Sequence, residues 1–200
     1  MSDKSTRDHI VEAADQLFYH NGFEHTSFSD IADAVKISRG NFYYYFKTKD
    51  DILEAVIDVR LAKTRAMLDQ WERDGRTPAE RIRSFIHILI TNRADIKQYG
   101  CPVGTLNAEL AKLDHGSRPE AAALFMLFRN WLCKQFALLG RKRDADALAM
   151  HVLAMSQGVA TLANTFQDDR FIQREVQQMD DWLALIADGE VPTSRPARVN

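Results

Sequence analysis

The chain has 200 residues, enough for one two-part domain or two small ones, and for a core without disulfides. Hydrophobic residues make up 46% and charged residues 27%, and the formal net charge is −2, so any nucleic-acid binding must rest on a local basic patch. Two cysteines are too few for a disulfide framework, and no apolar stretch approaches the roughly 20 residues of a membrane span. The polar N-terminus lacks the apolar run of a signal peptide, so we expect a cytoplasmic protein with no membrane partner.

The N-terminal quarter shows the apolar spacing of short helices. A stripe with Ile10 and Phe18 predicts a first helix over about 6–20, which ends at Asn21-Gly22 with a left-handed glycine. Thr26 or Ser27 caps a second helix through Val35, and Ser38 caps a third through Tyr45. A fourth helix is expected from near 48 to about 71.

Longer helices are expected over the remainder of the chain, and no hairpin signal occurs. Their approximate ranges are 78–97, 101–113, 119–139, 144–166 and 168–187. The predicted fold is therefore all-α, with about nine helices. We place a small three-helix domain at 1–50, a larger helical domain at 51–190 and a disordered tail at 191–200.

The second and third helices, joined by a tight turn behind the first, have the pattern of a helix-turn-helix. The exposed face of the third helix offers Arg39, Gly40, Asn41, Tyr43 and Tyr44. Residues 35–49 carry four basic side chains and no acid, although residues 1–50 hold more acidic than basic residues. The alternative is an ordinary helical hairpin with aromatic rings in its core. Tyr43-Tyr44-Tyr45 covers most of a helix circumference, however, so the three rings cannot all be buried together.

Two segments carry a family resemblance: Thr26-Ser27-Phe28-Ser29-Asp30-Ile31-Ala32, and the stretch from Ile37 to Leu53 with its Tyr-x-x-Phe-x-x-Lys pattern. Over roughly Arg7–Ala55 the chain resembles the TetR family of bacterial repressors. The resemblance implies that Thr26, Ser27 and Ser29 contact DNA phosphates, that the third-helix face reads bases and backbone, and that Lys49 grips a phosphate. Lys36 stands where the family often has glycine. A left-handed lysine there costs about 1 kcal/mol and could add a phosphate contact. The DNA-binding candidates are Thr26, Ser27, Ser29, Lys36, Arg39, Gly40, Asn41, Tyr43, Tyr44, Lys47 and Lys49.

The resemblance further implies a homodimer on a palindromic double-stranded operator, with a larger helical domain for ligand binding and dimerisation. A small molecule that enters this domain would release the repressor from DNA. The apolar faces of the last two helices could form the dimer surface or simply the core. The sequence also leaves open whether the regulator represses or activates.

Candidates for the ligand pocket are aromatic and polar residues on helices that could surround a cavity. They are His87, Tyr99, Asn107, Phe125, Phe128, Trp131, Met155 and Phe166. For each one singly, ordinary core packing is the competing interpretation. Taken together they indicate an apolar ligand.

Cys101 is the candidate sensor because Pro102 would begin a helix directly after it. At such a position free N–H groups and the helix dipole stabilise a thiolate, which favours reaction with electrophiles and oxidants. The stretch Tyr99-Gly100-Cys101-Pro102 also resembles a region of family members that sense electrophiles through a cysteine. The alternative is a small residue that only packs, and this is our expectation for Cys133.

Two other classes of protein compete with a regulator. The sequence does not support an enzyme, since the six histidines form no His-x-x-x-His spacing and no phosphate loop or nucleophile elbow occurs. We therefore expect no catalytic residue, metal or cofactor. A helical scaffold would show only non-specific, salt-sensitive DNA binding, so an operator-shift assay separates it from a regulator.

Overall fold

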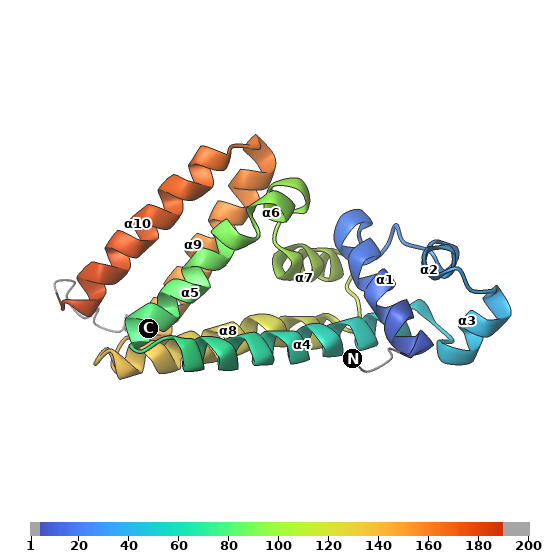
Figure 1. The fold of residues 1–200 in the computed structure, drawn as a ribbon, viewed down its shortest axis with the longest axis horizontal. Coiled ribbons are helices and arrows are strands. Elements are labelled where there is room, and N and C mark those ends of the chain that lie inside the picture. The colour runs from blue at the N-terminus through green and yellow to red at the C-terminus, as the bar shows by residue number, and fades with distance from the viewer. Residues whose placement is uncertain (1–4, 190–200) are drawn as a thin grey trace. The chain divides into compact units, whose positions relative to one another are not determined.

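A computed structural model describes residues 5–189, and within that range the chain folds into ten helices, with no strand (Figure 1). Their bounds are α1 Thr6–Asn21, α2 Phe28–Val35, α3 Arg39–Tyr45, α4 Lys49–Asp74, α5 Pro78–Thr91, α6 Arg93–Tyr99, α7 Pro102–Lys112, α8 Arg118–Leu138, α9 Ala145–Phe166 and α10 Asp169–Ala187. The all-α prediction is confirmed. The helix expected over 78–97 is broken at Asn92 into α5 and α6, which turns the expected nine helices into ten. The tail expected over 191–200 lies outside the described residues.

Local side-chain caps fix where most helices begin. Ser5, Ser27 and Thr77 each form a capping box with the acidic residue three positions later, at the starts of α1, α2 and α5. In each box the hydroxyl accepts from a backbone N–H that would otherwise lack a partner in the first turn. These signals need only neighbours in sequence, and for that reason the helix starts could be predicted.

The chain divides into two compact units that differ from the predicted domains. Unit 1 comprises residues up to Lys63 together with Pro102–Leu124, and unit 2 comprises Thr64–Cys101 and the chain from Phe125 on. Helix α7 therefore belongs to the same unit as the three N-terminal helices, instead of to the larger C-terminal domain.

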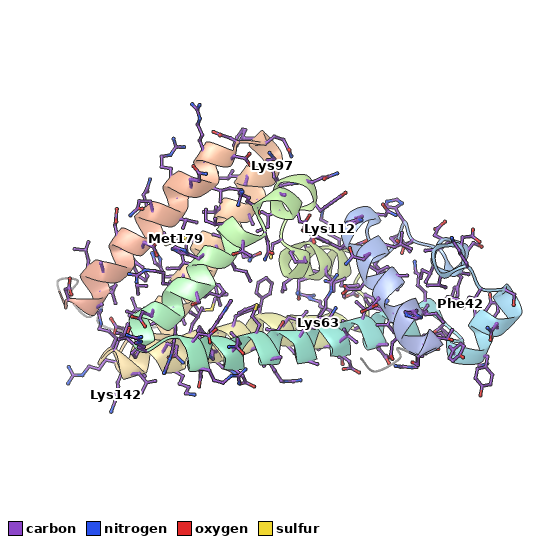
Figure 2. All side chains as sticks on the ribbon, in the orientation of Figure 1. Phe42, Lys63, Lys97, Lys112, Lys142 and Met179 are labelled. Carbon is purple, nitrogen blue, oxygen red and sulfur yellow. The ribbon has the colours of Figure 1, made fainter. Side chains whose placement is uncertain are left out.

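The core of unit 1 is built by the three N-terminal helices, the start of α4 and the inner face of α7. Fully buried members include Ile10 of α1, Ile31 of α2, Phe42 of α3, Ile52 of α4 and Leu110 of α7. Phe42 lies on the inner side of α3 (Figure 2). Because each of the short helices buries one apolar face here, none of them depends on helix propensity alone.

Unit 2 packs α5 against α10, and α9 against both α6 and α10 (Figure 1). Its core includes Ile82 of α5, Val152 of α9 and Met179 of α10, which is labelled in Figure 2. The buried pair Arg141–Asp144 lies in the turn between α8 and α9. In the described part of the chain, no helix is both long and apolar enough to cross a membrane.

Candidate DNA-binding surface and effector region

The turn between α2 and α3 has the geometry of a helix-turn-helix. Lys36 ends α2 in the left-handed conformation, with φ 56° and ψ 42°, and its N–H is bonded to the carbonyls of Ala32 and Asp33. The next N–H, that of Ile37, donates to the Ala32 carbonyl at 3.2 Å. The left-handed lysine expected from the sequence is therefore present, and its side chain is exposed.

Helix α3 has one buried face and one exposed face. Ser38 caps the helix by accepting from the Asn41 N–H at 3.3 Å, and Phe42 anchors the inner face. On the outer face Asn41 is exposed, as are the side chains of Tyr43 (48%) and Tyr44 (77%). Exposed tyrosines on a short, well-anchored helix form a surface that can bind a partner.

Gly40 lies on the same exposed face, and internal packing does not require a glycine there. A Cβ added at Gly40 would meet no atom within 4 Å inside the protein. The helix-propensity cost of about 1 kcal/mol is thus not explained by packing within the chain. It is explained if another molecule must approach the backbone of α3 closely.

The ring of Tyr43 is held in place by α2. It stacks on Phe28 with ring centroids 5.5 Å apart and an interplanar angle of 23°. A small pocket of about 70 Å³ lies beside this stack, lined by Phe28, Ser29, Ala32, Phe42 and Tyr43. The stack fixes the direction of the Tyr43 hydroxyl before any partner binds, which lowers the entropic cost of binding.

The basic side chains of this region have different environments. Lys36 and Lys47 are exposed, and the Lys47 ammonium also donates to the carbonyl of Tyr43 in the last turn of α3. The Lys49 ammonium instead donates to the carbonyls of Phe23 at 2.9 Å and Glu24 at 3.3 Å. It also lies 4.2 Å from the centre of the Phe23 ring. Lys49, expected to grip a phosphate, thus binds the α1–α2 turn in this structure.

The start of α2 departs from the sequence expectation at one residue. Thr26 is only 1% exposed, and its hydroxyl donates to the Gly22 carbonyl at 2.7 Å, so its side chain faces the end of α1 and not the DNA side. Ser27 is exposed and forms the capping box of α2, while Ser29 is half-buried on the pocket wall. Hydrogen bonds from the backbone and hydroxyl of Ser27 lower the pKa of Asp30 below its usual value. The side chain of Arg39, at the first position of α3, lies outside the described part of the structure.

Cys101 directly precedes Pro102, the first residue of α7, as the sequence predicts. The thiol is half-buried and not in a disulfide, and the side-chain amide of Gln157 on α9 lies 3.5 Å from its sulfur. Cys133, expected in the core of α8, is also half-buried and not in a disulfide.

The eight pocket candidates differ in burial and in their neighbours. Phe128 and Trp131 are buried against Phe85 and Trp71. Tyr99, Phe125 and Met155 are half-buried.

The other three candidates lie elsewhere. Phe166 is 69% exposed because α9 ends there, and His87 is exposed and paired with Asp180. Asn107 belongs to unit 1, where its amide donates to the carbonyls of Val103 and Ala121.

Sequence reasoning missed Glu109 and Arg60, two charged residues that hold unit 1 together. Glu109 accepts hydrogen bonds from the backbone of Phe23 and Glu24, and buried Arg60 links Asp15 to the carbonyl of Pro102. Their partners lie more than 40 positions away in the sequence, so no local pattern could have identified them.

A capped helix-turn-helix with an exposed, glycine-containing third helix, in a chain that also folds a second helical unit, indicates a DNA-binding transcriptional regulator. The comparison of sequences agrees: residues 10–56 match the family of bacterial regulatory proteins called the tetR family, and residues 78–178 match the C-terminal domain of LmrA/YxaF-like transcriptional regulators. The chain belongs to the TetR family. Members of this family are regulators and not enzymes, in agreement with the sequence prediction.

Individual relatives cover most of the chain. A helix-turn-helix regulator from the lacX 3′ region of Lactococcus lactis subsp. lactis is 32% identical over 170 residues, which are 82% of this chain and 86% of the relative. The repressor DhaR of Mycobacterium sp. (strain GP1) is 22% identical, with 97% and 96% of the two chains covered. A TetR regulator from Legionella pneumophila has the same fold, with a TM-score of 0.81 at 24% identity over 91% of this chain and 99% of that one.

Proposed function

We propose that this protein is a homodimeric repressor that binds a palindromic operator through α3 and is released by a small apolar or electrophilic molecule. The observation that carries the release mechanism is the place of Cys101, whose half-buried thiol directly precedes the first residue of α7. We also expect it to act in the cytoplasm, where it can reach the chromosome. Similarity to the repressor DhaR over nearly the whole chain supports repression over activation.

The operator-binding face consists of the outer side of α3 and its flanking lysines. Asn41 can pair with the edge of adenine in the major groove, and Arg39 with guanine. Tyr43, Tyr44, Lys36 and Lys47 supply hydrogen bonds and charge to phosphates. The Arg39 role follows from the sequence pattern alone.

The surface for a second copy of the chain is the outer face of α9. Met150, Ala154, Gly158, Leu162 and Phe166 follow one another at intervals of four residues, and all five are exposed. The apolar stripe predicted for α9 mainly packs inside the protein, since Val152 and Val159 lie in the core of unit 2. A ridge of large and small apolar residues that a monomer leaves in water fits helix-against-helix packing in a dimer.

The electrophile reaction at Cys101 needs no further reactant. The sulfur adds to a ring carbon of a quinone and forms a carbon–sulfur bond. The hydrogen of the thiol and the displaced ring hydrogen end on the two quinone oxygens, so the quinone becomes a substituted hydroquinone. The added group occupies the junction before α7 and would disturb its first turn.

The test compares the wild-type protein with Cys101→Ser and Cys133→Ser in an operator-release assay with a benzoquinone. We expect the wild type and Cys133→Ser to leave the operator, and Cys101→Ser to stay bound. Mass spectrometry should find the adduct on Cys101. Equal release of wild type and Cys101→Ser would rule out Cys101 as the sensor.

A further inference from the structure

The turn between α1 and α2 determines how the DNA-binding helices are held. Thr26 ties the turn to α1 through the Gly22 carbonyl, and Ser27 caps α2. Helix α2 in turn holds Tyr43 of α3 through the ring of Phe28. A shift of this turn therefore moves the surface that contacts the operator.

Two opposite charges clamp the backbone of this turn. The carboxylate of Glu109 on α7 accepts from the N–H of Phe23 at 3.0 Å and from the N–H of Glu24 at 2.9 Å. The ammonium of Lys49 on α4 donates to the carbonyls of the same two residues. Hydrogen bonds to charged groups are about twice as strong as neutral ones, so the clamp fixes this two-residue segment strongly.

The backbone conformation of Gly22 and its lack of a side chain allow the same contact. Its φ is +89°, with ψ at 155°, and a Cβ at this position would lie 3.0 Å from one carboxylate oxygen of Glu109. The predicted glycine therefore has a second role besides its positive φ. It lets the carboxylate reach the backbone of the turn.

Helix α7 is fastened to the rest of unit 1 at its start as well. Arg60 of α4 is buried, and its guanidinium donates to Asp15 of α1 at 2.6 Å and to the carbonyl of Pro102 at 2.8 Å. In the middle of α7, Asn107 donates to the Ala121 carbonyl of α8 at 3.1 Å. Glu109 therefore projects from a fixed helix and not from a loose one.

We propose that Glu109 is a positioning residue for operator binding and that α7 contributes to operator binding through this residue. Glu109 lies in the segment that matches a C-terminal domain and outside the matched helix-turn-helix segment. It does not touch DNA in this proposal. It holds the α1–α2 turn, and thereby α2 and α3, in the orientation that fits the major groove.

The sign of the effect separates positioning from simple electrostatics. DNA is a polyanion, so removal of a negative charge from the unit that binds it should by itself strengthen binding slightly. Loss of the clamp should weaken binding. Glu109→Gln removes the charge and places an amide NH₂ against one of the two backbone N–H donors. Glu109→Asp keeps the charge but is one methylene too short to reach both.

The experiment measures the affinity of purified full-length variants for the duplex that the wild-type protein enriches from random-sequence DNA. Glu120→Gln is the matched control. Glu120 is an exposed acid of the same unit, and its change to Gln removes one negative charge, as Glu109→Gln does. We expect both Glu109 variants to bind the operator about tenfold or more weaker. Glu120→Gln should bind as well as the wild type or slightly better, and affinity for a scrambled duplex should change by less than about twofold in all variants.

Amide hydrogen exchange without DNA gives an independent result. The N–H groups of Phe23 and Glu24 should exchange faster in Glu109→Gln, while the variant stays folded and keeps the dimer mass of the wild type. If Glu109→Gln proves unfolded, Glu109→Asp carries the same comparison. Equal or tighter operator binding by a folded Glu109 variant would overturn the inference alone. Failure of the wild type to enrich any sequence would overturn the proposed function on which the inference rests, and the inference with it.

Discussion

At the scale of single residues, the surface of α3 depends on a division between anchored and exposed aromatic rings. Phe42 is buried, Tyr43 is about half exposed and Tyr44 is largely exposed. Seven consecutive helical residues thus supply both the attachment to the core and the exposed face that we propose for DNA binding. The sequence predicts that the tyrosines cannot all be buried, but only the fold shows that Phe28 holds Tyr43.

Tyr43 offers a residue-scale prediction with a matched control. Tyr43→Ala removes the ring and hydroxyl from the exposed face, and operator binding should lose about 1–3 kcal/mol, in the range of one specific contact. Tyr43→Phe keeps the stack on Phe28 and should lose only the part due to the hydroxyl. Fluorescence anisotropy at physiological salt measures both, and light scattering should show an unchanged dimer. Wild-type affinity in Tyr43→Ala would mean that this side of α3 does not face DNA.

At the scale of elements, helix starts were predictable and long-range side-chain contacts were not. Ser5, Ser27, Ser38 and Thr77 cap helices through residues three positions away, which a sequence displays directly. The apolar spacing over 78–97 predicts one helix. The structure has a break at Asn92, because its backbone at φ −102° and ψ 17° leaves the helical range. A periodic pattern does not show such a local break.

Two of the expected site residues make contacts within the chain that the sequence did not predict. Thr26 and Lys49 are polar residues at positions typical of phosphate contacts, yet both bond to carbonyls at the end of α1 and in the turn after it. These hydrogen bonds depend on how the chain after α1 turns back toward α4. The sequence motif predicts which residues lie near DNA, while the fold decides which other contacts their side chains make.

The capping box of α2 makes a prediction about pH. Hydrogen bonds from the Ser27 backbone and hydroxyl hold the pKa of Asp30 below its usual value. The folded state thus favours the carboxylate, and this contribution to stability is present above the unfolded-state pKa and lost as pH falls through the folded one. Asp30→Asn should therefore lower the melting temperature at pH 7, and its difference from wild type should shrink below about pH 4.

The control for this effect is Asp33→Asn, which changes an exposed acid of the same helix outside the capping box. Thermal unfolding of the three proteins between about pH 6 and about pH 3 gives the comparison. A difference between wild type and Asp30→Asn that stays constant over this range would show that the charge of Asp30 does not stabilise α2.

At the scale of the whole molecule, the division of the chain differs from the division of the sequence. The motif predicts a boundary near residue 50, whereas unit 1 also includes α7 and the start of α8. Helix α7 begins directly after Cys101, and its Glu109 clamps the turn before α2. In the proposed release mechanism, a change at the Cys101–Pro102 junction would act on α2 and α3 through the hydrogen bonds of unit 1.

We propose that this protein reads a specific DNA sequence as a dimer, through α3. Selection of duplexes from a random-sequence pool by the wild-type protein at physiological salt, with Asn41→Ala in parallel, tests it most directly. We predict that the wild type enriches an inverted repeat, and that Asn41→Ala loses preference at one symmetric pair of positions. Enrichment of no sequence by the wild type, or an identical preference in Asn41→Ala, would contradict it.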